Sequence, residues 1–288
     1  MNNIATKQND AKFISFLKAQ RIAYSRCKNY QVFDTVSIII AIMTPIIGFT
    51  TPKILNIITV IGVIWTILYL ALDNIRKNKS SLGAKIQEQF DTELFKIKWN
   101  SILCKEKINI DTISDLALKY KKNDLFDWYS VEITPDLNSA LAIILCQRIS
   151  LSWENALKTK YATILLWSVI IFYSIIIATS LIINYGIFDT FLLISPTIPF
   201  LVYGVQNFLT IKSQKENRER LITEIDNLLD TYKNTRNLPD ENIIRNIQDV
   251  IYNERTTIEK TPDWFYRLFK QKFEDRTDEI IRNIKSEL

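Results

Sequence analysis

Four apolar stretches without a charged residue constrain this chain of 288 residues more than any other feature. Each one reaches, or nearly reaches, the roughly 20 residues that a helix needs to cross about 30 Å of hydrocarbon. Because lipid offers no hydrogen-bond partner to the backbone, the stretches are predicted to be helices. They form two closely spaced pairs, since only Lys53 interrupts the first pair and only Asp189 the second. The four stretches are residues 35–52, 54–72, 161–188 and 190–211.

The basic residues predict how these spans are oriented. All of the 36 Lys and Arg residues except Lys53 lie in residues 1–34, 73–160 and 212–288. Cytoplasmic segments next to membrane spans carry an excess of Lys and Arg. The three polar segments, and both termini with them, are therefore expected in the cytoplasm, and the two short connections are expected outside.

The polar segments also have helical patterns. Ile86, Phe90, Leu94 and Ile97 recur at helical spacing and predict a helix over residues 80–104. The chain has five glycines and no strand pattern, so we expect an all-α integral membrane protein with two transmembrane helical hairpins and a helical cytoplasmic domain. The predicted parts are an N-terminal cytoplasmic helix (1–34), hairpin 1 (35–72), a cytoplasmic helical domain as candidate sensor (73–160), hairpin 2 (161–211) and a C-terminal cytoplasmic helical region (212–288).

The composition argues against an enzyme. Histidine is absent, which removes the commonest general base, the commonest metal ligand and every Ser-His or Cys-His pair. The three cysteines lie far apart without a C-x-x-C pair, so free thiols are expected and no metal site. No glycine-rich phosphate loop is present either. Glu88 and Asp91 share one helix face, which leaves a metal-dependent hydrolase as one explanation and a solvated or ion-paired face as the other.

Polar residues recur along one face of the last apolar stretch. Ser195, Tyr203 and Gln206 follow helical spacing and are candidate pore-lining residues. The alternative is helix packing, because small and hydroxylated residues let membrane helices approach closely. No charged residue lies inside a span, which disfavours a transporter that is coupled to protons or ions.

Arginine and aromatic residues gather in the middle polar segment. A guanidinium can bind a phosphate with two parallel hydrogen bonds, and an aromatic ring can stack on a base. The combination indicates a nucleotide-binding surface. The alternative is a structural role at the membrane boundary, where Trp and Tyr also gather. The candidate ligand-binding residues are Arg148, Gln147, Trp153, Trp128 and Tyr129.

Several short motifs lie along the chain, before, between and after the two apolar pairs. They are Gln20-Arg21 with Tyr24, Gln87-Glu88 with Phe90-Asp91 and Trp99-Asn100, Asp127-Trp128-Tyr129, Cys146-Gln147-Arg148 with Trp153-Glu154 and Leu157-Lys158, and Ile251-Tyr252 with Arg255 and Pro262-Asp263-Trp264-Phe265-Tyr266. In these motifs nearly the whole chain resembles the SMODS-associating four-transmembrane effector family. These are bacterial membrane proteins encoded beside a cyclic-oligonucleotide synthase in antiphage signalling (CBASS) operons. Glu154 and Lys158 depart from the family pattern, which usually has Asp and Arg there, and lysine cannot copy a bidentate guanidinium.

The resemblance implies a membrane effector of antiphage defence that is not an enzyme. A cyclic di- or trinucleotide, and no cofactor, would open or assemble the membrane domain, so that the bacterial inner membrane is permeabilised and the infected cell stops growing or dies. Besides the lipid bilayer, further copies of the chain are expected partners, because four helices make a poor pore alone. Direct binding of DNA or RNA is not expected. The alternatives are a constitutive channel or transporter subunit and a membrane-anchored scaffold without pore activity.

Overall fold

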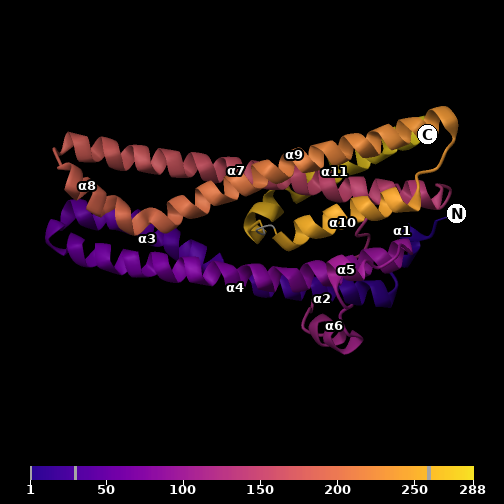
Figure 1. Cartoon of the computed structure of the whole chain (residues 1–288), viewed down its shortest axis with the longest axis horizontal. Coiled ribbons are helices and arrows are strands. Elements are labelled where there is room, and N and C mark those ends of the chain that lie inside the picture. The colour runs from indigo at the N-terminus through magenta and orange to yellow at the C-terminus, as the bar shows by residue number, and fades with distance from the viewer. Residues whose placement is uncertain (1, 29–30, 258–260) are drawn as a thin grey trace. The chain divides into compact units, whose positions relative to one another are not determined.

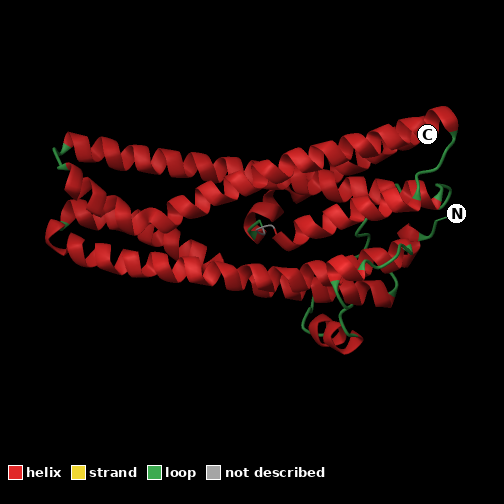
Figure 2. Ribbon diagram, viewed as in Figure 1, coloured by secondary structure: helices red, strands yellow, loops and turns green. Residues whose placement is uncertain are grey.

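The computed structural model describes residues 2–28, 31–257 and 261–288. Helices joined by loops and turns make up these ranges, and no strand occurs among the described residues (Figure 2). The predicted all-α class is therefore confirmed. In Figure 1 the elements are α1 (Ile4–Lys7), α2 (Ala11–Lys28), α3 (Gln31–Thr50), η1 (Pro52–Ile54), α4 (Leu55–Phe95), α5 (Ser101–Cys104), α6 (Ile110–Ala117), α7 (Ser139–Ile182), α8 (Ile187–Ile194), η2 (Ser195–Thr197), α9 (Ile198–Thr235), α10 (Glu241–Thr257) and α11 (Asp263–Glu287).

The chain divides into two compact units, each assembled from separate segments. Unit 1 consists of Met1–Arg26, Lys79–Lys158 and Ser213–Leu288, and unit 2 consists of Cys27–Asn78 and Thr159–Lys212. Helices α4, α7 and α9 contribute residues to both units. The five parts and their limits proposed from the sequence stay a prediction.

Unit 1 has the interior of a water-soluble helical protein. Leu17 of α2, Phe90 of α4, Ile144 of α7, Ile225 of α9 and Ile247 of α10 are buried in one apolar cluster. Full burial of such a side chain contributes about 1.5–3 kcal/mol relative to an exposed one. This cluster draws on all three polar segments of the sequence, so it stabilises the unit as a whole.

Unit 2 has the opposite distribution. Its exposed side chains include Ile57, Ile64 and Ile175, which are 62%, 54% and 60% exposed. Its buried side chains include the polar residues Ser37 and Thr44, which bond carbonyl groups one turn earlier in their own helix. Apolar groups outside and satisfied polar groups inside are what a hydrocarbon solvent requires.

Three helical stretches among the described residues are long and apolar enough to cross a membrane. They are Phe33–Thr50, Ser139–Ile182 and Ile187–Thr235. A fourth apolar helix, Asn56–Ala71, is shorter, and at 1.5 Å per residue it covers about 24 Å. The prediction of a membrane protein is thus confirmed with three long spans, whereas the span expected over residues 54–72 has a shorter apolar helix.

In unit 2, helices α3 and α4 lie side by side (Figure 1) and are joined by specific side-chain contacts. Trp65 donates its indole N–H to Ser37 Oγ at 2.9 Å, and the Tyr69 hydroxyl donates to Asp34 Oδ1 at 2.9 Å. The later residue of α4 meets the earlier residue of α3, so the two helices run antiparallel.

Helices α7 and α9 form the second antiparallel pair in unit 2. The Tyr161 and Tyr203 hydroxyls lie 2.6 Å apart, and the Tyr173 hydroxyl donates to the Thr197 carbonyl at 3.0 Å. The end of α7 is thereby antiparallel to η2 and the start of α9. Whether each pair is a hairpin across a membrane stays a prediction.

The helix predicted over residues 80–104 is interrupted at residues 96–100, between α4 and α5. α4 ends at Phe95, because Lys96 adopts a left-handed conformation (φ 58°) and the Ile97 N–H bonds the Thr92 carbonyl at 3.1 Å. This six-to-one bond is the Schellman ending of a helix. Asn100 then accepts the Ile102 and Leu103 N–H groups and begins the short α5.

Candidate functional site: a buried network of carboxylates and arginines

Two carboxylates of α4 lie inside unit 1 with no solvent exposure. Glu88 and Asp91 are both 0% exposed and are three residues apart, so one helix face carries both. Isolated charges in such a place would be very costly, because burial removes their hydration. Each carboxylate therefore needs hydrogen-bond donors from the surrounding helices.

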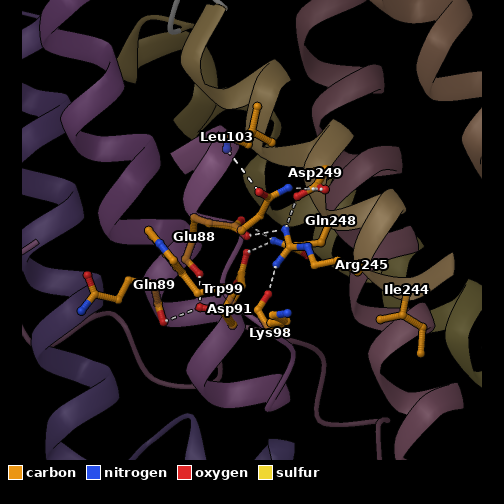
Figure 3. A network of polar contacts seen from close by, with 12 residues as sticks. Glu88, Gln89, Asp91, Lys98, Trp99, Leu103, Ile244, Arg245, Gln248 and Asp249 are labelled. Atoms are coloured by element: carbon orange, nitrogen blue, oxygen red, sulfur yellow. Dashed lines mark hydrogen bonds and ion pairs between the residues drawn. The ribbon is translucent and has the colours of Figure 1, made fainter. Parts of the chain in front are cut away.

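Helix α10 supplies most of these donors (Figure 3). Arg245 Nη2 lies 2.7 Å from Glu88 Oε1, and the Gln248 amide donates to Glu88 Oε2 at 2.8 Å and to Asp91 Oδ2 at 3.0 Å. Arg255 donates to Asp91. The three donors at positions 245, 248 and 255 share one face of α10, so a single helix contact neutralises both carboxylates.

Burial decides the protonation of this network. It raises the pKa of Glu88 to about 7, with the nearby Asp91 charge adding to the effect and Gln248 and Arg245 opposing it. Burial also raises the pKa of the Tyr129 hydroxyl, which donates to Asp91 Oδ1 at 2.7 Å. Glu88 therefore retains its proton to a higher pH than an ordinary glutamate, while Tyr129 stays a neutral donor.

Two of the predicted ligand-binding residues belong to this network. Tyr129 is the Asp91 donor described above. Gln147 of α7 donates to the Ile244 carbonyl at 2.9 Å and to Gln248 Oε1 at 3.1 Å. Both side chains are buried and tie α7 and the loop before it to α4 and α10. Their contact with a ligand stays a prediction.

Arg148, the adjacent candidate, faces a different partner. Its Nε and Nη2 atoms bond the two carboxylate oxygens of Asp226 in α9, at 2.7 Å and 3.1 Å. This bidentate pair links α7 to α9 within unit 1. A phosphate that binds Arg148 would have to replace Asp226 or share the guanidinium with it.

The remaining two candidates are Trp153, which contacts Tyr266 of α11, and Trp128, which is related to Tyr266 through Arg21. The ring centroids of Trp153 and Tyr266 are 6.1 Å apart. The guanidinium carbon of Arg21 lies 5.8 Å from the Tyr266 ring centroid and 5.4 Å from that of Trp128. We call Arg21, Trp128, Trp153 and Tyr266 the aromatic cluster.

A second group of charges lies near the end of unit 1. Arg218 of α9, 0% exposed, bonds Glu254 of α10 at 2.6 Å. The Lys158 ammonium lies 2.8 Å from Glu154 Oε2, one turn earlier in α7. Glu154 and Lys158, the two departures from the family pattern, therefore form an ion pair with each other.

The predicted pore-lining residues occupy different environments in unit 2. Ser195 and Tyr203 are buried, and Tyr203 is bonded to Tyr161. Gln206 is exposed. The structure therefore does not bring the three to one common surface, and their contact with a pore stays a prediction.

The sequence patterns did not single out several buried polar residues, two in the network and one in unit 2. Arg245 and Gln248 lie between the isoleucines of an amphipathic stripe, and that position was the available signal. Asp34 was assigned to the polar N-terminal segment, yet it is 3% exposed in unit 2 and accepts from Tyr69. Polar residues that interrupt an apolar stripe are candidates for buried partners.

The described residues offer little to a metal or a disulfide. No group of three or more His, Cys, Asp or Glu side chains that could bind a metal ion occurs among them. Cys104 and Cys146 are free and buried, while the Cys27 side chain lies outside the described part. Glu88 and Asp91 face arginines, so their surroundings favour the ion-paired explanation over a hydrolase.

The fold is that of an all-helical membrane protein: unit 2 carries the apolar helices, and unit 1 contains the buried polar network. Residues 2–284 match the model of the SMODS-associating 4TM effector domain, and the chain belongs to this family of effectors. It is 30% identical over 294 residues to a Bacillus cereus (strain VD146) protein named as a probable CBASS effector molecule, and the match covers 95% of each chain. No solved structure matches the chain.

Proposed function

We propose that the protein is an antiphage effector of the bacterial inner membrane that a cyclic oligonucleotide activates. In this proposal unit 1 is the cytoplasmic sensor, unit 2 spans the membrane, and both termini are cytoplasmic. Activation opens or assembles a pore from several copies of unit 2, and loss of the membrane barrier stops the infected cell. The match to the effector family over residues 2–284 is the observation that carries the proposal.

Helix continuity supports a link between the two activities. Helices α4, α7 and α9 have residues in both units, so each provides a covalent path from a ligand in unit 1 to the membrane. A ligand can shift the packing of these helices only by the difference between its affinities for the two packings. The buried network joins α4, α7 and α10 through Glu88, Gln147 and Gln248, and a rearrangement there would move all three.

Dye release from liposomes tests the proposal. Purified protein is reconstituted at several protein-to-lipid ratios and challenged with cyclic di- and trinucleotides. Release with one nucleotide, and none without it, is the expected result. Release that needs no ligand would favour a constitutive channel, and sealed liposomes under every condition, from inserted and folded protein, would favour a scaffold.

The oligomeric state can be measured in the same samples. Crosslinking with and without the activating nucleotide should yield multimers whose abundance rises with dye release. Monomers at full release would contradict assembly of a pore from several copies.

A further inference from the structure

One arginine of unit 1 differs from all its buried counterparts. Among the described residues, five arginine side chains are not fully exposed to solvent. Four of them pair with carboxylates: Arg148 with Asp226, Arg218 with Glu254, Arg245 with Glu88 and Arg255 with Asp91. The fifth, Arg21, has no ion pair with a described carboxylate.

Aromatic rings take the place of that carboxylate. Arg21 of α2 lies over the rings of Trp128, in the loop before α7, and of Tyr266, in α11. Its Nε atom is buried and has no hydrogen-bond partner. A buried donor without a partner is costly in free energy, and ring contacts on the faces of a guanidinium leave the N–H groups at its edges unused. The positive charge and its donors therefore remain free for an anion.

The neighbouring side chains suit a nucleotide. Trp128 and Tyr266 are partly exposed, so their rings can be reached from solvent, and bases stack on such rings. Tyr120 is close enough to Arg21 for the positive charge to lower its pKa. Burial, and to a smaller extent the hydrogen bond to Asp124, nevertheless raise the pKa of Tyr120 to about 12, so the hydroxyl stays neutral. Asp124 accepts the hydrogen bond from the Tyr120 hydroxyl.

We infer that Arg21, Trp128 and Tyr266 form the site that binds one phosphodiester and one base of the activating cyclic oligonucleotide. The guanidinium edge donates to the phosphate, and the base stacks on the exposed part of the Trp128 or Tyr266 ring. This inference rests on the proposed function and adds a site to it. The three residues come from the N-terminal, middle and C-terminal segments of unit 1, so a bound ligand would stabilise one packing of those segments.

Binding measurements on the full chain test the site. The protein is placed in phosphatidylcholine nanodiscs and titrated with cyclic di-AMP, cyclic di-GMP, cyclic GMP–AMP and cyclic tri-AMP. Arg21→Ala should lower the affinity for the nucleotide that binds roughly ten- to hundredfold, because a charge-assisted hydrogen bond is lost. Arg21→Lys should also weaken it, because an ammonium neither stacks nor binds a phosphate with two parallel bonds.

Arg236→Ala is the matched control. Arg236 also lies over an aromatic ring, that of Tyr232 at 5.3 Å, but it is exposed and bonds the Leu288 carbonyl. Its loss should change nucleotide affinity by less than about twofold, as for other exposed contacts. Unchanged affinity in Arg21→Ala would overturn the site and leave the proposed function intact, whereas a wild-type protein that binds none of the four nucleotides would overturn both.

A fluorescence readout covers the case in which Arg21→Ala fails to fold. Trp128→Phe keeps an aromatic ring of similar shape, so the unit should remain folded. Quenching of tryptophan fluorescence by the bound nucleotide should fall in this variant while most of the affinity remains. Undiminished quenching would overturn stacking on Trp128 and, with unchanged affinity in Arg21→Lys, the site itself.

Lipid phosphate could satisfy the same guanidinium, and nanodisc composition separates the two sources. The nucleotide titrations are repeated with phosphatidylglycerol in place of phosphatidylcholine. The effect of Arg21→Ala on nucleotide affinity should be similar in both lipids. An effect that occurs only with phosphatidylglycerol would assign Arg21 to lipid headgroups and overturn the proposal.

Discussion

Arg255 and Asp91 form an ion pair inside unit 1 in which the two side chains are 3% and 0% exposed. Asp91 also accepts from Tyr129 and Gln248, so its donors come from two chain segments, α10 and the loop before α7. Burial lowers the pKa of Arg255, but the attraction of Asp91, together with smaller contributions from Tyr129 and Glu154, leaves that pKa above its ordinary value. The pair therefore stays ionised in the folded protein, and its two members depend on each other.

Removing one member of this pair should be costly. Arg255→Ala leaves Asp91 buried with one donor fewer, and breaking such a pair typically costs about 3–5 kcal/mol. Thermal unfolding of the detergent-solubilised protein should show a large drop in melting temperature. Arg282→Ala, which removes an exposed pair with Glu132, should cost less than about 1 kcal/mol. Equal drops in the two variants would contradict the importance of burial.

Glu88 should make the stability of unit 1 depend on pH. Its pKa is about 7 in the folded protein against an ordinary 4.5, so the folded state retains a proton that the unfolded chain releases between these values. The stabilisation that comes from this proton is complete below about pH 4.5 and is lost as the pH rises through about 7. Above that pH Glu88 makes no further change to the stability.

The Glu88→Gln variant isolates this contribution. Glutamine cannot titrate and keeps one of the two acceptor oxygens, so it accepts from Arg245 or from Gln248 but not from both in their present positions. Melting temperatures measured between about pH 5 and pH 8 should fall less than those of the wild type. Charged neighbours that also bear on Glu88 are Asp91 and Arg245, and both are unchanged in the variant. An identical pH dependence in the two proteins would show that another group is responsible.

Close helix contact in unit 2 should make Gly62 intolerant of a side chain. A Cβ atom there would lie 2.3 Å from Pro196 Cβ and 2.4 Å from Pro196 Cα. Gly62→Ala should therefore destabilise the protein by about 1–3 kcal/mol, because backbone has to move. Gly186→Ala is the control, since its Cβ would meet only Asp189 Oδ2 at 3.4 Å. Melting temperatures in detergent measure both, and a harmless Gly62→Ala would contradict the packing.

Gln206 and Tyr203 separate pore lining from helix packing. Gln206 is exposed in unit 2, and if it lines a pore, Gln206→Leu should lower the conductance of the activated protein in planar bilayers. The Tyr203 hydroxyl is bonded to Tyr161, so Tyr203→Phe should lower stability by about 1 kcal/mol and alter conductance less. Conductance that Gln206→Leu leaves unchanged would remove Gln206 from the lining.

Periodicity predicted the helices of this protein well, because apolar spacing is a local property of the chain. It predicted the part of α4 that carries Ile86, Phe90 and Leu94, for example. It missed the break at Lys96, where a left-handed residue that is not glycine ends α4. Nothing in the composition of that segment distinguishes such an ending from a continuing helix.

The partners of the candidate site could not be predicted in the same way. Arg245 and Arg255 are far from Glu88 and Asp91 in sequence, and only the packing of α10 on α4 makes them neighbours. The family resemblance drew attention to Gln147, Arg148 and Trp153, but it did not reveal that the first two have protein partners. Side-chain pairing between distant segments depends on the three-dimensional contact, which a single sequence does not specify.

The buried network also fixes an order of events during synthesis. Glu88 and Asp91 leave the ribosome 157 and 164 residues before Arg245 and Arg255. Until α10 emerges, both carboxylates must stay hydrated, since no other described arginine is bonded to them. The apolar helices of unit 2 are all translated before Arg245, so a nascent chain can meet the membrane before unit 1 acquires its buried ion pairs. Ribosomes that stall before residue 255 would therefore release chains with spans but without the neutralised core of unit 1.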